Sequence, residues 1–334
     1  MLSCQLFVGD GRTLRVDPGV TVFAQPDPEQ PGVAPSLVVE QGGKLHAEGT
    51  AAAPITFTSW HDEEAPIDRQ IVSDSASLDA ASGAVEQGVR GKWGGLVLLG
   101  RAPINARGGT NEVEGLSGRL YGGSDPTDSS GVLRYVRVWH AGAVISEDNE
   151  INGLTLAGVG RGTVVSHVEV AYSLDDGFEF FGGTVDVDHL SVLYIGDDAF
   201  DFDAGYRGRG QYLFAMLGSE GDHAIEADAE GANRRRSHPR FFSGTVIGAG
   251  AASRDTSMML LRRQTGGAFG NWVLAGGRGP AVQLASCDAA VNVTQHAPAL
   301  AAALAVAEPP PAEEDTLWLG SHNLYDAANP WLDV

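Results

Sequence analysis

Hydrophobic and polar positions recur at a fixed interval in the middle of the chain. The segment HVEVAYSLDDGFEFFGG begins at His167, HLSVLYIGDDAFDFDAG begins at His189, and QYLFAMLGSEGDHAIEADAEG begins at Gln211, so successive copies start 22 residues apart. The third copy carries three extra residues before its acidic part. Apolar residues align in three sets: Val168, Leu190 and Tyr212; Val170, Val192 and Phe214; Tyr172, Tyr194 and Met216. Residues 167–230 therefore contain three copies of one repeat unit.

Inside each copy, apolar and polar residues alternate with the period of a β-strand. The FEF and FDF segments predict inward-facing rings at Phe178, Phe180, Phe200 and Phe202, with Glu179 and Asp201 facing outward. Short β-rich runs between Gly, Pro and Asp turns also fill residues 5–58, 132–170 and 241–277, and residues 92–105 are typical of a buried strand pair. Residues 60–90 and 111–131 are polar and predict loops.

A 22-residue step predicts a right-handed parallel β-helix. One coil of that architecture has about three short strands, and equivalent positions of successive coils stack one strand spacing apart. Leucine-rich repeats, calcium-binding nonapeptide arrays and propeller blades need other patterns or longer periods. We expect an all-β solenoid over residues 1–297, followed at 298–334 by an Ala/Pro-rich linker or cap and a C-terminal tail.

The charge balance excludes several partners. The 334 residues include 43 acidic and 22 basic side chains, for a net charge of −21. Nucleic acids and anionic membranes need a basic face, which this composition does not favour. No apolar run reaches the length of a membrane span, and the N-terminus shows no signal-peptide pattern. Cys4 and Cys287 fall at opposite ends of the solenoid, so we expect two free thiols.

Several segments also carry a resemblance: GTAAAPITFTS, GKWGGLVLLGRAPIN, YGGSDPTDSSGVLRYVRV, LDDGFEFFGGTV and GDDAFDFDAGYRGRGQ. Across residues 5–277 the chain resembles a family of secreted or surface-attached bacterial β-helix proteins, most of which have no assigned activity. The resemblance implies a pectin-lyase-like fold and an extracellular or cell-surface location. It implies little about activity.

Acidic residues follow the same register as the hydrophobic ones. If Glu179, Asp201 and Glu226 point outward from consecutive coils about 4.8 Å apart, each neighbouring pair repels by about 0.9 kcal/mol in water and about 3.5 kcal/mol at an effective dielectric of 20. Further acids flank them on the turns: Asp175, Asp176, Asp197, Asp198, Asp203, Asp222 and Asp228. Many hard oxygen ligands suit Ca²⁺. The alternatives are acids that cap turns by accepting backbone N–H bonds, or catalytic carboxylates.

Candidate catalytic and glycan-binding residues surround these acids. Polysaccharide lyases of the resembled fold pair Ca²⁺ with a basic residue that removes a proton, a role open to Arg207 or Arg209; these arginines can equally offset neighbouring acids as ion pairs. Asp176 and Asp198 are candidates for hydrolysis, which needs two carboxyls at a suitable separation. The Gly-His-Gly and Arg-Ile-Lys elements of polygalacturonase-type enzymes are absent. Tyr206, Arg207, Arg209 and His223 are candidate glycan contacts.

The histidines form a ladder of their own. His167 and His189 occupy equivalent positions one coil apart, and Gln211 continues the row. Two stacked imidazoles can hold a metal, but no Cys or third His accompanies them, which favours a surface ladder. The sequence therefore predicts an exported or surface-associated β-helix that binds a polysaccharide or surface glycan, or acts as an adhesive scaffold, with a Ca²⁺-loaded acidic face. The alternatives are a polysaccharide-degrading enzyme, a uronate lyase before a glycoside hydrolase, and a purely structural solenoid.

Overall fold

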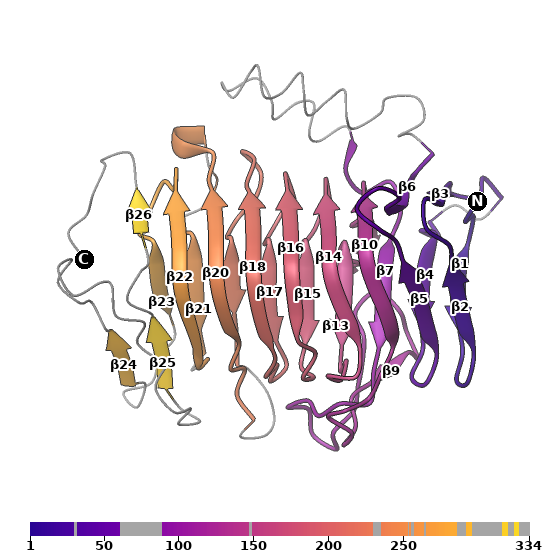
Figure 1. Cartoon of the computed structure of the whole chain (residues 1–334), viewed down its shortest axis with the longest axis horizontal. Coiled ribbons are helices and arrows are strands. Elements are labelled where there is room, and N and C mark those ends of the chain that lie inside the picture. Colours follow the sequence, from indigo (N-terminus) through magenta and orange to yellow (C-terminus); the bar gives the residue numbers. More distant parts are fainter. Residues whose placement is uncertain are drawn as a thin grey trace.

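Two long parallel sheets run along the molecule, one in front of the other in Figure 1. The computed structural model describes residues 1–29, 32–60, 89–146, 149–229, 235–252, 254, 257–263, 265–285, 292–295, 316–319 and 324–326. Within these residues the chain is all-β apart from short helical turns, and no helix has the length and apolar character needed to cross a bilayer. The predicted parallel β-helix is confirmed.

The sheet that carries the acids has nine described strands. In spatial order they are β1 (Gln5–Val8), β4 (Ser36–Val39), β7 (Gly95–Leu99), β13 (Leu154–Ala157), β15 (Phe178–Phe181), β17 (Phe200–Asp203), β19 (Ile225–Ala227), β21 (Met259–Arg262) and β23 (Val282–Ala285). Each strand pairs in parallel with the strand of the next coil, which stacks equivalent residues in rows.

The other sheet has thirteen described strands and lies in front in Figure 1. Its main path is β2 (Thr13–Val16), β5 (Lys44–Glu48), β10 (Gly131–Trp139), β14 (Val164–Ala171), β16 (Val187–Leu193), β18 (Arg209–Met216), β20 (Arg240–Ile247), β22 (Gly267–Ala275), β25 (Thr316–Leu319) and β24 (Asn292–Gln295). The strands β3 (Thr21–Ala24), β6 (Ile55–Ser59) and β26 (Leu324–Asp326) join it at the side.

The central coils contain two strands each, where the sequence predicts about three. In the first coils the second and third strands are separate, and β10 pairs with both β5 and β6. From β10 onward the two are fused into one long strand that bends at a single residue with positive φ. We call these residues the kink ladder: Tyr135, His167, His189, Tyr212, Ser243 and Asn271.

The kink ladder corrects the predicted alignment of the third copy. Asp188 pairs with Gln211 and Leu190 pairs with Leu213, so the residue that follows His189 in the ladder is Tyr212 and not Gln211. The turn after β17 contains one residue more than the turn after β15, because Phe181 aligns with Asp203 and Val187 with Gly210. The predicted alignment is right for the acidic part, where Asp201 pairs with Glu226.

The core lies between the sheets and is built from stacked rings. Phe178 stacks on Phe200 and Phe180 on Phe202, with ring centroids 5.6 and 5.0 Å apart. All four rings are fully buried, as the alternation predicts. Tyr206 joins them, since its ring lies 4.7 Å from that of Phe180 and is fully buried as well.

Other elements differ from the predictions in detail. Residues 92–105 contain one strand, β7, and not a strand pair. The predicted loop at 111–131 forms a small antiparallel hairpin of β8 (Asn111–Glu112) and β9 (Leu120–Tyr121), and β11 (Val144–Ser146) pairs with β12 (Asn149–Glu150). Most of the predicted 60–90 loop and Cys287 lie outside the described residues; Cys4 is an exposed free thiol. In the predicted C-terminal segment, β25 and β26 pair with β22.

Candidate functional site

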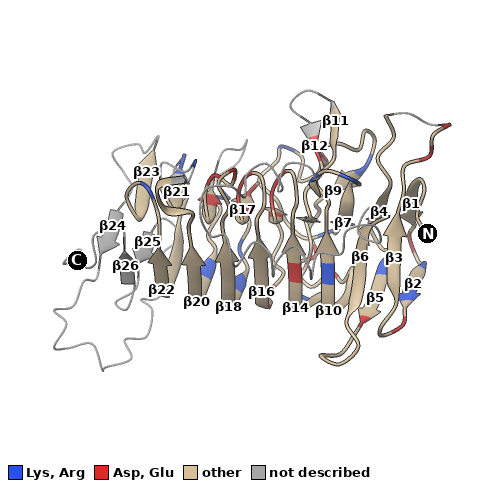
Figure 2. Cartoon of the chain, turned by 90° about the horizontal axis from the view of Figure 1, so that it is seen from above, with Lys and Arg blue, Asp and Glu red and all other residues tan. Residues whose placement is uncertain are grey.

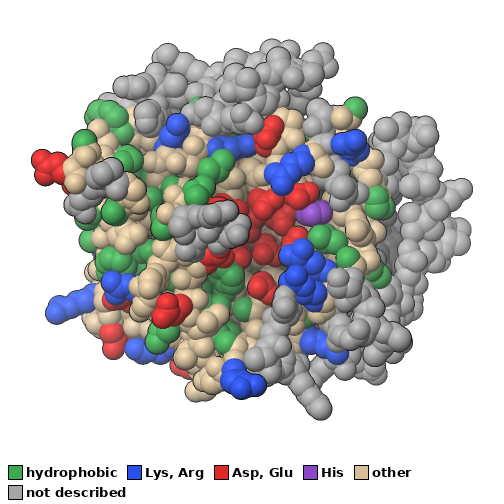
Figure 3. All heavy atoms as spheres, turned by 180° about the vertical axis from the view of Figure 1, so that it is seen from behind, with side chains coloured by type: hydrophobic (Ala, Val, Ile, Leu, Met, Phe, Trp, Pro, Cys, Tyr) green, Lys and Arg blue, Asp and Glu red, His purple; other side chains and the backbone are tan. Residues whose placement is uncertain are grey.

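The acidic residues gather on the outer face of the nine-stranded sheet. Figure 3 shows them as one red area, with histidine and basic side chains beside it, and Figure 2 places them around β17, on the side of the molecule away from β14, β16 and β18. The central row consists of Glu179 from β15, Asp201 from β17 and Glu226 from β19, paired in register. Thr155 precedes this row and Leu260 follows it. We call Glu179, Asp201 and Glu226 the carboxylate row.

A second row lies in the turns that precede these strands. The backbone N–H of Asp198 donates to Asp176 Oδ1 over 2.9 Å, and the backbone N–H of His223 donates to Asp198 Oδ1 over 2.6 Å. Each acid therefore fixes the turn of the next coil. Gly177 follows Asp176 because a Cβ there would lie 2.7 Å from the carbonyl oxygen of Ala199. The predicted turn-capping role is real for Asp176 and Asp198.

The carboxylates face away from the core but are not open to water. Glu179 and Asp176 are each 7% exposed and Glu226 is 8% exposed. The expectation of an outward acidic ladder needs this correction. The segment between β7 and β10 (residues 100–130), which carries β8 and β9 and which we call the hairpin insert, reaches the row. Tyr121 of β9 is buried close enough to feel the charges of Asp203 and Glu179. In such surroundings repulsion between carboxylates is much less screened than at an open surface.

Burial and mutual repulsion raise the pKa values of these groups. The pKa values of Asp176, Glu179 and Asp201 lie well above the ordinary range, first because burial disfavours the charged form and then because each faces other carboxylates. For the same reasons the pKa of Asp175 rises to about 8 and that of Glu226 to about 7. The flanking groups Asp197 and Asp203 each reach a pKa of about 6.

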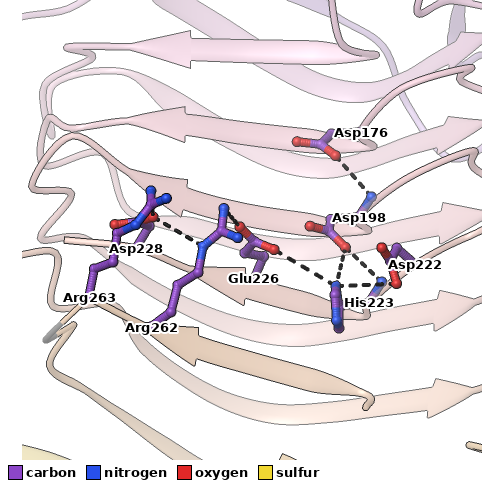
Figure 4. A network of polar contacts seen from close by, with 8 residues as sticks. All are labelled: Asp176, Asp198, Asp222, His223, Glu226, Asp228, Arg262 and Arg263. Carbon is purple, nitrogen blue, oxygen red and sulfur yellow. Dashed lines mark hydrogen bonds and ion pairs between the residues drawn. The ribbon is translucent and has the colours of Figure 1, made fainter. Parts of the chain in front are cut away.

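Two arginines close the row on its C-terminal side (Figure 4). Arg262, from β21, forms an ion pair with Glu226 and donates from Nε to Asp228 Oδ2 over 3.1 Å. Arg263 reaches the same oxygen over 2.6 Å. Counted without their backbone, the side chains of Glu226 and Asp228 are 11% and 5% exposed, so these pairs offset charges that water reaches poorly.

His223 occupies the position of an Asp in the preceding coils. Its Nδ1 lies 3.0 Å from Asp198 Oδ1, 3.7 Å from Asp222 Oδ1 and 3.8 Å from Glu226 Oε2. Burial opposes protonation, but these three acids outweigh it and raise the pKa of His223. Its Nε2 is buried and has no hydrogen-bond partner within the described part of the chain.

The described residues include three groups that bring ligand atoms within 4.8 Å of one another on this face. They are Asp175, Asp176 and Asp197; Asp176, Glu179 and Asp201; and Asp198, His223 and Glu226. The first two offer only carboxylate oxygens, the donor set that Ca²⁺ prefers. Asp201 Oδ1 is buried without a hydrogen-bond partner in the described structure, which fits an oxygen aimed at a cation.

A cavity of about 440 Å³ adjoins the row beneath the hairpin insert. Arg107, Glu112 and Tyr121 line it from the insert, and Phe181 and Asp203 line it from the sheet. The cavity falls within the size range of ligand pockets and has acidic, basic and aromatic walls.

The structure separates the other predicted site residues from this face. Tyr206 is fully buried and donates to the carbonyl of Val185, so it is not available for contact with a glycan. Arg209 pairs with Asp186 over 2.6 Å at the start of β18, as the ion-pair alternative predicts, and Arg207 Nε donates to the carbonyl of Arg236. The predicted acids and His223, in contrast, do come together.

The 22-residue repeat of acids does not by itself assign three further contributors to the site. Asn152 donates to Glu179, Tyr121 arrives with the hairpin insert, and Arg262 pairs with the row from the coil after it. Arg262 was detectable, because it lies one coil beyond Asp228 in a run of strand residues. Asn152 occupies the position of Asp176 one coil earlier and was detectable as well, because Leu154 pairs with Phe178; Tyr121 stands outside the repeat.

A comparison with protein-family models matches residues 1–70 and 80–304 to a pectate-lyase-like β-helix domain. The chain belongs to this family. The match extends the resemblance seen in the sequence over most of the chain and agrees with the stacked parallel sheets. No curated protein and no solved structure matches the chain.

Proposed function

We propose that this β-helix protein binds a polysaccharide or surface glycan through Ca²⁺ held on the acidic face of the nine-stranded sheet, outside the cell or at its surface. The observation that carries the proposal is the burial of the carboxylate row among further acids. Glu179 and Asp201 have strongly raised pKa values, so without a partner these groups retain protons and lose their charge. A bound divalent cation compensates the charges and keeps the carboxylates ionised.

Acidic glycans are the substrate class that this chemistry favours. A calcium ion takes six to eight oxygen ligands, so an ion held by two or three protein carboxylates has positions left for the carboxylate or hydroxyl oxygens of a sugar. Arg262 and Arg263 border the row and can receive further carboxylates. The adjoining 440 Å³ cavity offers Tyr121 and Arg107 beside the same face. The family's relation to pectate lyases supports a uronate-containing ligand.

Calcium binding is tested by titration of the EDTA-treated chain at neutral pH. We expect Ca²⁺ to raise the Tm and to release protons, because the carboxyls with raised pKa values must ionise to bind it. Double substitution Glu179→Gln and Asp201→Asn keeps the shape of the row and should abolish both effects. The matched control is Asp186→Asn, an acid on the opposite side that pairs with Arg209. An unchanged Tm and no proton release in the wild-type chain would contradict the calcium site.

Glycan binding is tested separately on an array that contains uronate polymers, with Ca²⁺ and with EDTA. We expect retention of uronate-containing polysaccharides in Ca²⁺ alone, and loss of retention in the Glu179→Gln, Asp201→Asn chain. Calcium binding without any glycan retention would support the calcium site and contradict the proposed glycan ligand.

Hydrolysis of a polysaccharide is the second candidate. Glu226, with a pKa of about 7, is suited to donate a proton at neutral pH, and it shares a group with Asp198 and His223. This arrangement favours a hydrolase over a lyase, since Arg209 is paired elsewhere. Release of reducing ends from uronate polymers, lost in Glu226→Gln, supports it. Binding without turnover excludes it.

A further inference from the structure

The kink ladder changes which side chains face solvent on the thirteen-stranded sheet. Val165 and Val168 both belong to the core, as do Val187 and Leu190, so two consecutive residues stand outside the core between each pair. The reason is the left-handed conformation at His167 and His189, whose φ angles are 55° and 52°. A regular strand would place only one of two neighbours outside. Ser166 therefore accompanies His167, and Asp188 accompanies His189.

This arrangement supplies the third ligand that the sequence lacks. The rings of His167 and His189 stack with centroids 4.2 Å apart. Asp188 Oδ1 lies 2.6 Å from His189 Nδ1 and 4.0 Å from His167 Nδ1. The ligand atoms of all three residues lie within 4.8 Å of one another. Ser166 Oγ donates to Asp188 Oδ1 over 2.6 Å and so positions the carboxylate.

The surroundings of Asp188 and His167 shift their pKa values in directions that suit metal binding. Burial opposes ionisation of Asp188, but hydrogen bonds from Ser166 and His189 outweigh it and lower its pKa. Burial and the neighbouring His189 lower the pKa of His167, which keeps this imidazole neutral. A carboxylate and a neutral imidazole are the forms that coordinate metal ions.

The cluster is open to ions from solvent. His167, Asp188 and His189 have side chains that are 36%, 47% and 45% exposed. The two histidines line a groove of about 620 Å³ together with Tyr135 and Tyr212, their neighbours in the kink ladder. Parallel rings cannot both direct a lone pair at one ion, so binding turns at least one ring about its Cβ–Cγ bond, and the open groove leaves space for that rotation.

We propose that His167, Asp188 and His189 form a second metal site, selective for Zn²⁺ and related transition-metal ions over Ca²⁺. Two imidazoles and one carboxylate are a donor set typical of zinc, and they leave a fourth position for water or a ligand. The all-oxygen groups on the opposite sheet favour Ca²⁺ instead. The site is independent of the proposed glycan function, because it lies on the other sheet.

The experiment is calorimetric titration of the full-length, metal-free chain with Zn²⁺ at neutral pH, followed by Co²⁺ with detection of its visible absorption. We expect the stoichiometry to fall by one Zn²⁺ per chain in the double variant His167→Gln, His189→Gln. Ser166→Ala should retain the site with affinity about 10-fold weaker. The matched control is His46→Gln, a histidine of the same sheet that lies 3.8 Å from Glu48. Far-UV circular dichroism verifies that each variant is folded.

Two results would overturn the proposal. One is the absence of Zn²⁺ binding by the wild-type chain. The other is an unchanged stoichiometry in the folded double variant, which would assign the bound Zn²⁺ elsewhere, for example to Asp198, His223 and Glu226. Displacement of the bound Zn²⁺ by millimolar-range Ca²⁺ would remove the claimed selectivity.

Discussion

The two sheets of this β-helix stack ionisable side chains by the same rule and obtain opposite results. On the nine-stranded sheet, like charges repeat from coil to coil at buried positions, and the pKa values of Glu179 and Asp201 rise. On the thirteen-stranded sheet, a single carboxylate lies beside two stacked imidazoles at half-exposed positions, and the pKa values of Asp188 and His167 fall. Coil stacking supplies proximity in both cases. Burial and the sign of the neighbour decide whether that proximity favours the charged form.

The largest effect is expected from Arg262→Ala. This substitution leaves Glu226 without its arginine partner at a site where its side chain is 11% exposed, while Arg263 remains on Asp228. Because Arg262 is itself partly exposed, we expect a loss of about 1–3 kcal/mol in the free energy of unfolding, measured with urea in EDTA. Arg209→Ala is the control on the exposed pair with Asp186 and should cost less than about 1 kcal/mol. Equal losses would contradict the contrast between buried and exposed pairs.

The second-largest effect is expected in the pH dependence of stability, which differs between the acidic face of the nine-stranded sheet and the histidine cluster of the thirteen-stranded sheet. Asp175 and Glu226, with pKa values of about 8 and about 7, bind protons more tightly folded than unfolded. Their stabilising contribution is present below the ordinary carboxyl pKa of about 4 and is lost as the pH rises to about 8. The raised pKa of His223 acts in the same direction. In EDTA we therefore expect the Tm to decrease over this interval.

Substitutions on each sheet test which groups cause this decrease in Tm with pH. Asp201→Asn removes one of the repelling carboxyls and should flatten the decrease in Tm. His167→Gln should not flatten the decrease and should make it slightly steeper, since the lowered pKa of His167 contributes with the opposite sign, being lost as the pH falls. A Tm that rises steadily between about pH 5 and about pH 8 in EDTA would contradict the raised carboxyl pKa values.

The smallest effect is expected from His189→Ala. The ring of His189 stacks between His167 and Tyr212, but it is 45% exposed. We expect the free energy of unfolding to decrease by about 0.5–1 kcal/mol, as for other aromatic pairs. Thermal and urea unfolding in EDTA measure it. A loss of several kcal/mol would place the kink ladder among the elements that hold the fold together.

The sequence predicts the coil and its inward rows well, because those features repeat. Phe178 and Phe200 are in register 22 residues apart, and alternation alone assigns them to the core. The prediction that Gln211 follows His189 in the ladder is wrong by one residue, because a single additional residue in a turn leaves no trace in the hydrophobic pattern. Asp188 was missed for a different reason, because it shares a face with His189 only where the backbone is left-handed.

The site is less predictable than the coil because part of it comes from outside the repeat. The acids of the carboxylate row were identified by their spacing, but their burial depends on the hairpin insert that carries Tyr121. No local pattern connects that insert to β15 and β17. The raised pKa values thus follow from a long-range contact, whereas the identity of the acids follows from the repeat.

The kink ladder also defines which substitutions the thirteen-stranded sheet tolerates. A left-handed backbone costs an L-residue roughly 1–2 kcal/mol and is least unfavourable for Gly and Asn, and Asn271 already stands in one such position. The side chains there lie outside the core, so their chemistry can change from coil to coil while Val168 and Leu190 keep the interior constant. Gly, Asn and Ser are admissible at every rung, but Val and Ile are not. The kink ladder is therefore a row of surface positions at which new sets of ligand side chains can be introduced without redesign of the fold.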